Sequence, residues 1–431
     1  MKRVIIAAAA LALAACEPAS KSDGSETYGA EPTLAPPKAS AIPTINARKA
    51  VGWPAGAAPT PAEGLKVARF AEGLDHPRWL YRLPNGDILV AEANSPPREA
   101  KGIEAAVAKR MMEKAGAGVP SANRITLLRD ADGDGVAELK TPFITGLNSP
   151  IGMALVGDQL FIANTDSVVA FTYTPGATRI EGAGRKIADL PAQAPNNHWV
   201  RNVIASPDGS TLYVSVGSNS NIGEHGMDTE RERAAILAMN LDGSGRRIFA
   251  SGLRNPNGMA FEPVTGLLWT VVNERDMIGH DTPPDYMTAV RDGGFYGWPW
   301  SYWGQNVDER VEPANPAMVA RALKPSYALG AHTASLGLHF YGGELLPERY
   351  RGGVFIGQHG SWNRNPPSGY RVIFVPFTAG NPSGQPVEIL GGFLNAKGEA
   401  QGRPVGVIED SAGALLVADD VGNIIWRVTP A

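Results

Sequence analysis

Residues 252–261 read Gly-Leu-Arg-Asn-Pro-Asn-Gly-Met-Ala-Phe, and a Pro-x-x-Gly turn at 263–266 leads on to the apolar run Leu-Leu-Trp-Thr-Val-Val at 267–272. Two short apolar runs separated by a Pro/Gly turn predict two antiparallel strands joined by that turn. Arg254 and Asn255 stand just before the first strand, where a backbone bend would direct their side chains away from the sheet.

The chain repeats this pattern six times, with copies that begin at residues 73, 146, 198, 252, 336 and 402. A spacing of about 50 to 85 residues suits one four-stranded blade for each copy, together with inserted loops. The sequence therefore predicts an all-β fold, a six-bladed β-propeller of four-stranded antiparallel blades over residues 63–431. We expect one domain, because each blade buries its faces only against its neighbours.

One insertion after the first copy is predicted to be helical. Residues 99–114 are rich in Ala, Lys and Glu, and Ile103, Val107 and Met111 follow helical spacing. The adjacent pair Met111 and Met112 is more typical of packing against a blade than of a cofactor contact.

The start of the chain has the features of an export signal. A basic start and an apolar run, too short to cross a bilayer of about 30 Å, precede Leu-Ala-Ala-Cys at 13–16, which has the form of a lipobox. We therefore expect residues 1–15 to be a lipoprotein signal peptide and Cys16 to carry the lipid. An ordinary secretory signal with a chance cysteine is the alternative. Cys16 is the only cysteine, so its lipidation leaves none for a disulfide, a haem attachment motif or a Cys-based metal site.

Residues 16–62 are rich in Ala, Pro, Ser and Thr, and this composition predicts a tether that buries no core. Without the signal peptide, 37 basic residues face 43 acidic residues. Mild acidity without a basic block argues against nucleic acid as a partner. We expect a lipoprotein on the periplasmic side of a bacterial membrane, and Glu17 after Cys16 favours the outer membrane.

Residues 130–135 read Asp-Ala-Asp-Gly-Asp-Gly. Asp130, Asp132 and Asp134 at alternate positions resemble the first half of a calcium loop. Thr141 stands where an EF-hand needs its bidentate Glu, so the full motif fails. Two interpretations stay open: a second calcium site, or a hairpin turn with solvated carboxylates.

Propeller function usually lies where the loops that enter the blades converge around the central channel. The candidate residues are the polar ones at these entries: Asn148, His198, Arg201, Arg254, Asn255 and Arg403. His198 near arginines is a candidate general base, because cationic neighbours favour the neutral imidazole. Arg201, Arg254 and Arg403 would together suit a carboxylate ligand. Salt bridges between blades are the alternative role for each of them.

These residues resemble the PQQ-dependent sugar dehydrogenases, the group that holds the soluble glucose or aldose dehydrogenases and the L-sorbosone dehydrogenases. The resemblance spans residues 65–428, and its most specific pieces are Leu-Arg-Asn-Pro-x-Gly at 253–258, His-x-x-Arg before Ser-Pro-Asp-Gly at 198–209, and Tyr-Gly-Trp-Pro at 296–299. The stretches most similar to the sorbosone branch are 273–276, 357–364 and 402–406.

The resemblance implies PQQ at the channel mouth, chelated to calcium. His198 matches the family's general base, which takes the proton of the sugar C1 hydroxyl while hydride passes to the quinone. Arg254 and Asn255 match residues that touch the cofactor, and Asn148 is a weaker match.

The resemblance also implies that the backbone carbonyls of Arg275 and Asp276 hold the calcium, and that Asp285 matches a further Asp of the family. The glucose branch has Gly-Pro in this calcium loop. It also has two Arg one residue apart in the last unit, where this chain has only Arg403. Arg364 or His359 would replace a family Lys that meets the cofactor carboxylates.

The resemblance thus implies PQQ-dependent oxidation of an aldose or related sugar. Electrons would pass to a separate cytochrome or quinone, since the chain has no haem motif. One alternative is a calcium-dependent lactonase, for which Glu92, Asn202 and Asp276 supply the residue types. A non-catalytic propeller lipoprotein that serves as a binding platform is the other.

Overall fold

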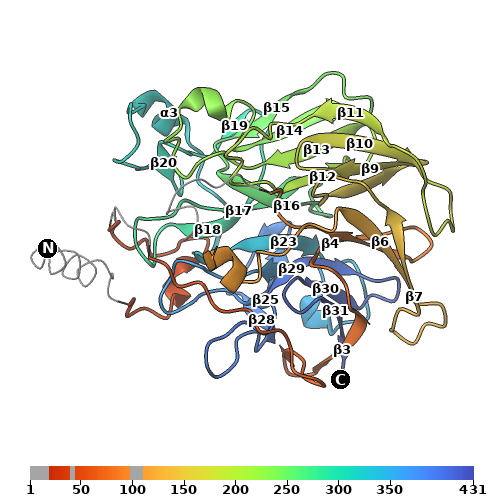
Figure 1. The fold of residues 1–431 in the computed structure, drawn as a ribbon. Coiled ribbons are helices and arrows are strands. Elements are labelled where there is room, and N and C mark those ends of the chain that lie inside the picture. The colour runs from red at the N-terminus through yellow and green to blue at the C-terminus, as the bar shows by residue number, and fades with distance from the viewer. Residues whose placement is uncertain (1–18, 39–43, 98–109) are drawn as a thin grey trace, which may run out of the picture.

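The computed structural model describes residues 19–38, 44–97 and 110–431, and it confirms the six-bladed β-propeller. Six sheets of four or five strands are arranged around a central axis, with the first strands of the blades innermost (Figure 1). The signal peptide and Cys16 lie outside the described residues. No helix among the described residues is long and apolar enough to cross a membrane.

Every blade is antiparallel through its four main strands. Blade 1 contains β4 (Pro77–Arg82), β5 (Ile88–Glu92), β6 (Arg124–Arg129) and β7 (Leu139–Ile144). Blade 2 contains β8 (Met153–Val156), β9 (Gln159–Ala163), β10 (Ser167–Thr172) and β11 (Arg185–Asp189). Blade 3 contains β12 (Arg201–Ala205), β13 (Thr211–Val216), β14 (Ala235–Asn240) and β15 (Arg247–Ser251), with β19 (Gly294–Phe295) parallel to β15.

The other three blades take strands from the start of the chain. Blade 4 contains β16 (Asn255–Phe261), β17 (Leu268–Asn273), β18 (Pro284–Ala289), β22 (Tyr327–Ala331) and β1 (Tyr28–Gly29). Blade 5 contains β23 (Ser335–Phe340), β24 (Val354–Gln358), β25 (Arg371–Val375), β28 (Val387–Gly391) and β2 (Thr60–Pro61). Blade 6 contains β29 (Pro404–Glu409), β30 (Leu415–Asp419), β31 (Ile424–Pro430) and β3 (Leu65–Glu72), so the N-terminal strand β3 closes the ring against the last strand of the chain.

The remaining elements lie in the loops. They are the ribbons β20 (Ser301–Tyr302) with β21 (Asn306–Val307) and β26 (Phe377–Thr378) with β27 (Asn381–Pro382), the helix α3 (Pro316–Arg321), and the 3-10 turns η1 (Ser25–Thr27), η2 (Met227–Glu230) and η3 (Glu348–Tyr350). The core lies between neighbouring blades: Phe355 of blade 5 packs in one cluster with Trp426 of blade 6, and Phe161 of blade 2 in another with Val214 of blade 3. This is the packing expected when each blade buries only its faces.

The strand register defines one end of the ring. The first residue of β16, Asn255, pairs with the last residue of β17, Asn273, and Ser335 at the start of β23 pairs with Gln358 at the end of β24. The loop into each blade and the loop after its second strand therefore lie at the same end. We call this end the entry face.

The segment predicted to be a tether packs against the propeller where the structure describes it. Tyr28, which is 9% exposed, extends blade 4 as part of β1, and β2 extends blade 5. Trp53 donates from Nε1 to the Asp419 carboxylate (2.6 Å) and packs edge-on against Phe393 and Trp426. The described part of this segment is therefore docked, because a few aromatic residues and backbone hydrogen bonds are enough to hold a chain on exposed sheet edges. We call residues 19–62 the arm.

The insertion between β5 and β6 is helical over residues 110–114. Ile103 and Val107 lie outside the described residues, while Met111 and Met112 are half-buried. The carbonyl of Lys114 accepts a hydrogen bond from the backbone N–H of Ala50 in the arm (2.8 Å).

Candidate active site on the entry face

His198 lies in the loop that enters blade 3, and its orientation is fixed from two sides. Buried Arg201 donates to the carbonyl of His198 (2.6 Å) and to the carbonyl of Pro191 (2.6 Å), which holds the loop in place. The His198 Nδ1 atom lies 2.8 Å from the Ser218 carbonyl. A carbonyl only accepts, so Nδ1 carries the proton in this contact and Nε2 carries the lone pair of the neutral ring. This is the tautomer in which Nε2 can act as a base.

Gly217 brings His198 next to Asn255 of blade 4. A Cβ atom at Gly217 would lie 2.5 Å from His198 Cβ and 2.4 Å from Asn255 Oδ1, so only glycine permits this approach. Asn255 Oδ1 is buried and has no hydrogen-bond partner within the described part of the chain. A buried acceptor of this kind is usually satisfied by a water molecule or a ligand.

Arg254 is 4% exposed and is held by the loop after β17. Its guanidinium donates to the Glu274 carbonyl (2.6 Å), to Asn221 Oδ1 (2.9 Å) and to the Asp276 carboxylate (2.9 Å). The other oxygen of Asp276 accepts from Asn363 Nδ2 of blade 5 (2.7 Å). Arg254 thus occupies the predicted place at the mouth, with one carboxylate as its counter-ion.

A second charged cluster joins blades 1, 5 and 6. Asp420 Oδ2 accepts from Arg78 Nη1 (2.6 Å) and from His359 Nε2 (2.8 Å), and His76 Nε2 lies 3.4 Å from the same oxygen. Burial and the nearby Arg403 lower the pKa of His359 to about 3, so its imidazole is neutral. Burial alone would raise the pKa of Asp420, but His359, His76 and Arg78 hold it well below its usual range.

Arg78 connects this cluster back to blade 3. Its guanidinium lies 5.7 Å from the ring centroid of Trp199, the residue after His198. Arg78 Nε is buried without a hydrogen-bond partner among the residues that the structure describes. Arg78 therefore has donor capacity directed away from Asp420.

Arg403 lies at the entry of blade 6, as predicted. Its main contacts order the loop after β24. Its Nε donates to the His359 carbonyl (2.9 Å) and its Nη2 to the Gly360 carbonyl (2.7 Å). Its guanidinium also lies 5.3 Å from the ring centroid of Tyr370.

Four other predicted cofactor contacts have structural partners instead. Arg201 is fully buried beneath the His198 loop, where burial and the neighbouring Arg233 lower its pKa to about 9. Arg364 donates to the His280 carbonyl and pairs with Asp281 (2.6 Å) at the edge where the arm docks. Both guanidiniums are thus engaged by protein groups, whereas the sequence predicted that they would meet a carboxylate ligand.

Asp285 and Asn148 also serve the fold. Asp285 accepts from the backbone N–H groups of Glu274 (2.9 Å) and Ala334 (2.7 Å), which joins blade 4 to blade 5. Burial raises its pKa. Asn148 donates to Asp166 (2.7 Å) within blade 2.

The Asp276 carbonyl, one of the two predicted calcium donors, does not fit a metal ion. The Asp276 carbonyl accepts from Arg275 Nε (3.1 Å), from Arg275 Nη2 (2.9 Å) and from Asn221 Nδ2 (3.1 Å). A guanidinium thus occupies the position from which this carbonyl would bind calcium, and Arg275 also pairs with buried Asp308. Because the lone pairs of the Asp276 carbonyl are already engaged, we derive no calcium chemistry from it.

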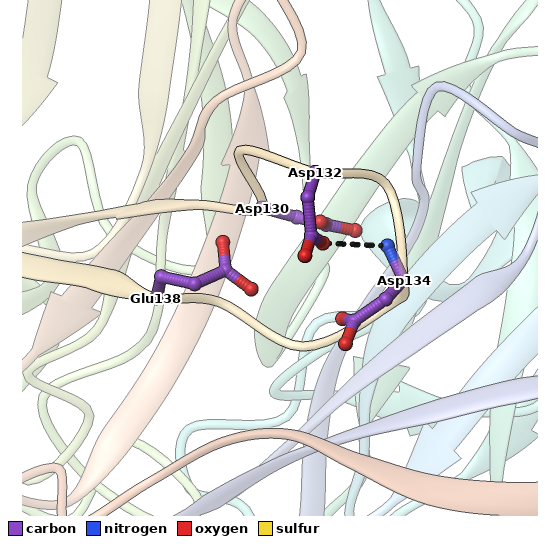
Figure 2. Close-up of side chains that lie close together, drawn as sticks. All are labelled: Asp130, Asp132, Asp134 and Glu138. Carbon is purple, nitrogen blue, oxygen red and sulfur yellow. Dashed lines mark hydrogen bonds between the residues drawn. The ribbon is translucent and has the colours of Figure 1, made fainter.

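The Asp130 loop gathers four carboxylates in the hairpin between β6 and β7 (Figure 2). Ligand oxygens of Asp130, Asp132, Asp134 and Glu138 all lie within 4.8 Å of one another. Each of these carboxylates accepts a backbone N–H of the same loop, which orients it. Sequence reasoning missed Glu138, which sits three residues before the position tested for an EF-hand Glu.

Sequence reasoning also missed Arg78, His76 and the counter-ion Asp420. The signal was present, since His-Pro-Arg at 76–78 stands at the entry of the first unit just as His198 to Arg201 stands at the entry of the third.

A family model described as TrAA12-like matches residues 59–287 and 307–431. The chain belongs to the TrAA12-like family. An uncharacterized protein of Borreliella burgdorferi is 30% identical over 293 residues, which are 65% of this chain and 76% of that protein. An aldose sugar dehydrogenase of Escherichia coli is 26% identical over 182 residues, 39% of this chain and 47% of the enzyme.

Among solved structures, the holo form of the PQQ domain of pyranose dehydrogenase from Coprinopsis cinerea has the same fold. Its TM-score is 0.68 at 21% identity, and the match covers 86% of this chain and 96% of that domain. The likeness to the PQQ-dependent sugar dehydrogenase family is thereby confirmed. The comparisons do not single out the sorbosone branch.

Proposed function

We propose that this TrAA12-like protein is a PQQ-dependent dehydrogenase that oxidises an aldose or related sugar, with His198 as the general base. The observation that carries the proposal is the hydrogen bond of His198 Nδ1 to the Ser218 carbonyl, which leaves the lone pair of the neutral ring on Nε2, in a loop that meets Asn255 at Gly217. The family relationship and the named relatives above support the choice of chemistry.

The charge of the entry face suits PQQ, a polycarboxylate with a planar ring. Arg78, Arg254 and Arg403 are each less than a tenth exposed, and the carboxylates that pair with them are Asp276 and Asp420. The imidazoles of His76 and His359, whose pKa values burial lowers, are neutral and add no charge to this cluster. A buried site with more guanidinium than carboxylate stabilises a bound anion, because guanidinium donates two parallel hydrogen bonds to a carboxylate.

When bound, PQQ supplies an electrophilic quinone that accepts a hydride. The chain would hold it with Arg254, Asn255 and Arg78. His198 Nε2 would remove the proton of the sugar hydroxyl, and the Ser218 carbonyl would stabilise the resulting imidazolium through Nδ1–H. Arg201 is a positioning residue, since it acts only through the backbone of the His198 loop.

The positions of the lactonase candidates do not favour that alternative. Glu92 pairs with Arg124 (2.8 Å) inside blade 1, and Asn202 donates to the Asn257 carbonyl (3.3 Å) between blades 3 and 4. Asp276 is the counter-ion of Arg254. A binding platform without catalysis gives no reason to fix the tautomer of a histidine beside paired guanidiniums.

The anchor, location and electron acceptor belong to the same proposal. We propose that Cys16 carries a lipid and that the protein acts on the periplasmic side of a bacterial membrane, more specifically the outer membrane. Without a haem motif in the chain, the electrons leave to a separate cytochrome or quinone.

The test uses the mature protein incubated with PQQ, in parallel with and without calcium. Aldose-dependent dye reduction is expected in the parent. We expect His198→Ala to bind PQQ with an unchanged absorption spectrum and to reduce it with sugar at least about 10²-fold more slowly, because a general base contributes about 10²–10⁴-fold. His225→Ala, which changes an exposed histidine in the loop after β13, is the matched control. Equal rates for His198→Ala and the parent would refute the assignment of the base.

A further inference from the structure

We infer that the entry face, which carries the candidate active site, is held against the lipid bilayer. The inference rests on the proposed lipid anchor at Cys16. It concerns the orientation of the propeller, which a lipid on a long flexible tether would leave undetermined.

The arm is fixed to the propeller at Ser20, close to its N-terminal end. The backbone N–H of Ser20 donates to the Asn365 carbonyl (2.7 Å), and its hydroxyl donates to Asp281. Two residues later the Ser22 carbonyl accepts from Arg364 (3.3 Å), which is 2% exposed and pairs with Asp281. A buried guanidinium with a carboxylate partner makes this a rigid attachment point.

The attachment point lies on the entry face. Asp281 is in the loop that follows β17, and Asn365 is in the loop that follows β24. Both loops leave the ends at which β16 and β23 begin, as the register of Asn255 with Asn273 and of Ser335 with Gln358 requires. The loop after β24 also supplies Asn363, which bonds to the counter-ion of Arg254.

The connection to the lipid is too short to reach the other face. Ser20 is four residues after Cys16, and a fully extended chain spans at most about 3.6 Å per residue, or roughly 14 Å in all. The seven residues of β16 alone extend over about 23 Å along the blade. A lipid on Cys16 therefore brings the bilayer to the entry face.

The surface around the attachment point is suited to a membrane interface. Ile45 and Trp362 are 47% and 39% exposed, although the neighbours of Trp362 in its loop, Ser361 and Asn363, are buried. The Asn46 backbone N–H donates to the Trp362 carbonyl (2.7 Å), so the part of the arm that carries Ile45 is docked on the loop that carries Trp362. Tryptophan is enriched at the level of the lipid headgroups, where its ring is partly apolar and its N–H meets water. An electron acceptor would then reach the active site from the bilayer side.

The experiment uses single cysteines as labelling sites, because the only native cysteine is consumed by the lipid. Ile45→Cys places the label on the entry face. Val264→Cys places it in the turn between β16 and β17, where Phe261 pairs with Leu268 at the opposite end of the blade and Val264 is 72% exposed. Each full-length lipidated variant carries a fluorophore and is added to preformed phosphatidylcholine–phosphatidylglycerol vesicles that contain a headgroup-quencher lipid.

We expect several-fold stronger quenching at position 45 than at position 264, and equal or reversed quenching would overturn the orientation. Insertion of about twenty Gly and Ser residues between Pro18 and Ala19 should keep vesicle binding and remove the contrast, because a flexible linker of that length no longer restricts the propeller. A contrast that survives the insertion would overturn the role of the short connection. If the parent does not bind vesicles at all, the proposed anchor fails and the inference fails with it, whereas PQQ-dependent sugar oxidation is measured separately.

Discussion

The guanidiniums of the entry face differ in what they leave for a ligand. Arg201, Arg364 and Arg403 donate mostly to backbone carbonyls, so their role is to order loops. The Arg254 guanidinium already donates to four protein acceptor atoms, so a bound anion would have to share its donors. Arg78 has one carboxylate partner and an unpaired Nε among the described residues, which makes it the guanidinium best placed to gain a ligand.

Arg78→Ala tests this difference. Removing the guanidinium leaves Asp420 buried without its permanent cation, so the free energy of unfolding should fall by about 3–5 kcal/mol. The affinity for PQQ per folded molecule should fall at least about 30-fold, since truncating one partner of a buried ion contact costs about 2 kcal/mol or more. Calorimetry measures the first quantity and PQQ titration the second.

The double variant Arg78→Ala/Asp420→Asn is the matched control. It removes the unpaired carboxylate, so stability should largely return while PQQ affinity stays low. Recovery of both properties together would show that Arg78 acts only through the fold.

Asp419 gives a pH dependence of stability with a definite sign. Its carboxylate is fully buried and accepts from Trp53, Trp426 and two backbone N–H groups, but it pairs with no cation among the described residues. Burial raises the pKa of Asp419 to about 6 from 3.8. An acid with a raised folded-state pKa binds its proton more readily in the native state, so stability rises as the pH falls from about 7 towards 4.

The gain from Asp419 is of the order of 3 kcal/mol, from a pKa shift of about two units. Buried Glu274, whose pKa burial raises to about 7, adds to the trend with the same sign. Asp419→Asn should therefore flatten, but not abolish, the rise in denaturation midpoint between pH 7 and pH 5. An unchanged slope in Asp419→Asn would contradict the assignment.

The sequence predicted blade entries well, and it predicted contacts between blades poorly. The positions of His198, Arg254 and Asn255 on the entry face could be predicted because each stands at a fixed place in a repeated unit. The partners of Arg364, the Ser22 carbonyl and Asp281, could not be predicted, and neither could the pairing of Arg78 with Asp420, which lies 342 residues away. Such pairs depend on the closure of the ring, which no local pattern encodes.

At the level of single elements, the hairpin between β6 and β7 carries a property separate from the active site. This hairpin lies at the opposite end of blade 1 from the entry face, and its carboxylates are already turned towards one another (Figure 2). Calcium binding there would relieve the mutual repulsion of four carboxylates and stabilise the native state by mass action.

We expect calcium to raise the melting temperature of the parent and to lose this effect in Asp132→Asn/Asp134→Asn. Terbium luminescence and calorimetry in EGTA and in calcium provide the measurements. Asp208→Asn, in an exposed hairpin turn of blade 3, is the control and should respond like the parent. A solvated turn without metal would give no terbium signal and no calcium-dependent shift in the parent.

At the scale of the molecule, the ring closes through β3 and β31, and the arm lies outside that closure. β3 begins at Leu65, so a chain that starts at residue 63 retains all six blades. The arm covers edges of blades 4 and 5 through β1 and β2, and it places Trp53 on Trp426 of blade 6. An exposed sheet edge lowers stability and promotes pairing with another chain.

Comparing the chains 63–431 and 19–431 therefore separates the contribution of ring closure to stability from the contribution of the arm. Both should fold, because the hydrophobic clusters between blades lie in the propeller itself. The shorter chain should unfold at a lower temperature, since it loses Tyr28 and Trp53 and each buried aromatic side chain contributes about 3–5 kcal/mol at most. It should also self-associate at lower concentration through the uncovered edges of β22 and β28, which light scattering detects. A third chain, 19–431 with Trp53→Ala, should fall between the two in melting temperature. If all three melt together, the packing of the arm contributes nothing measurable to the stability of the propeller.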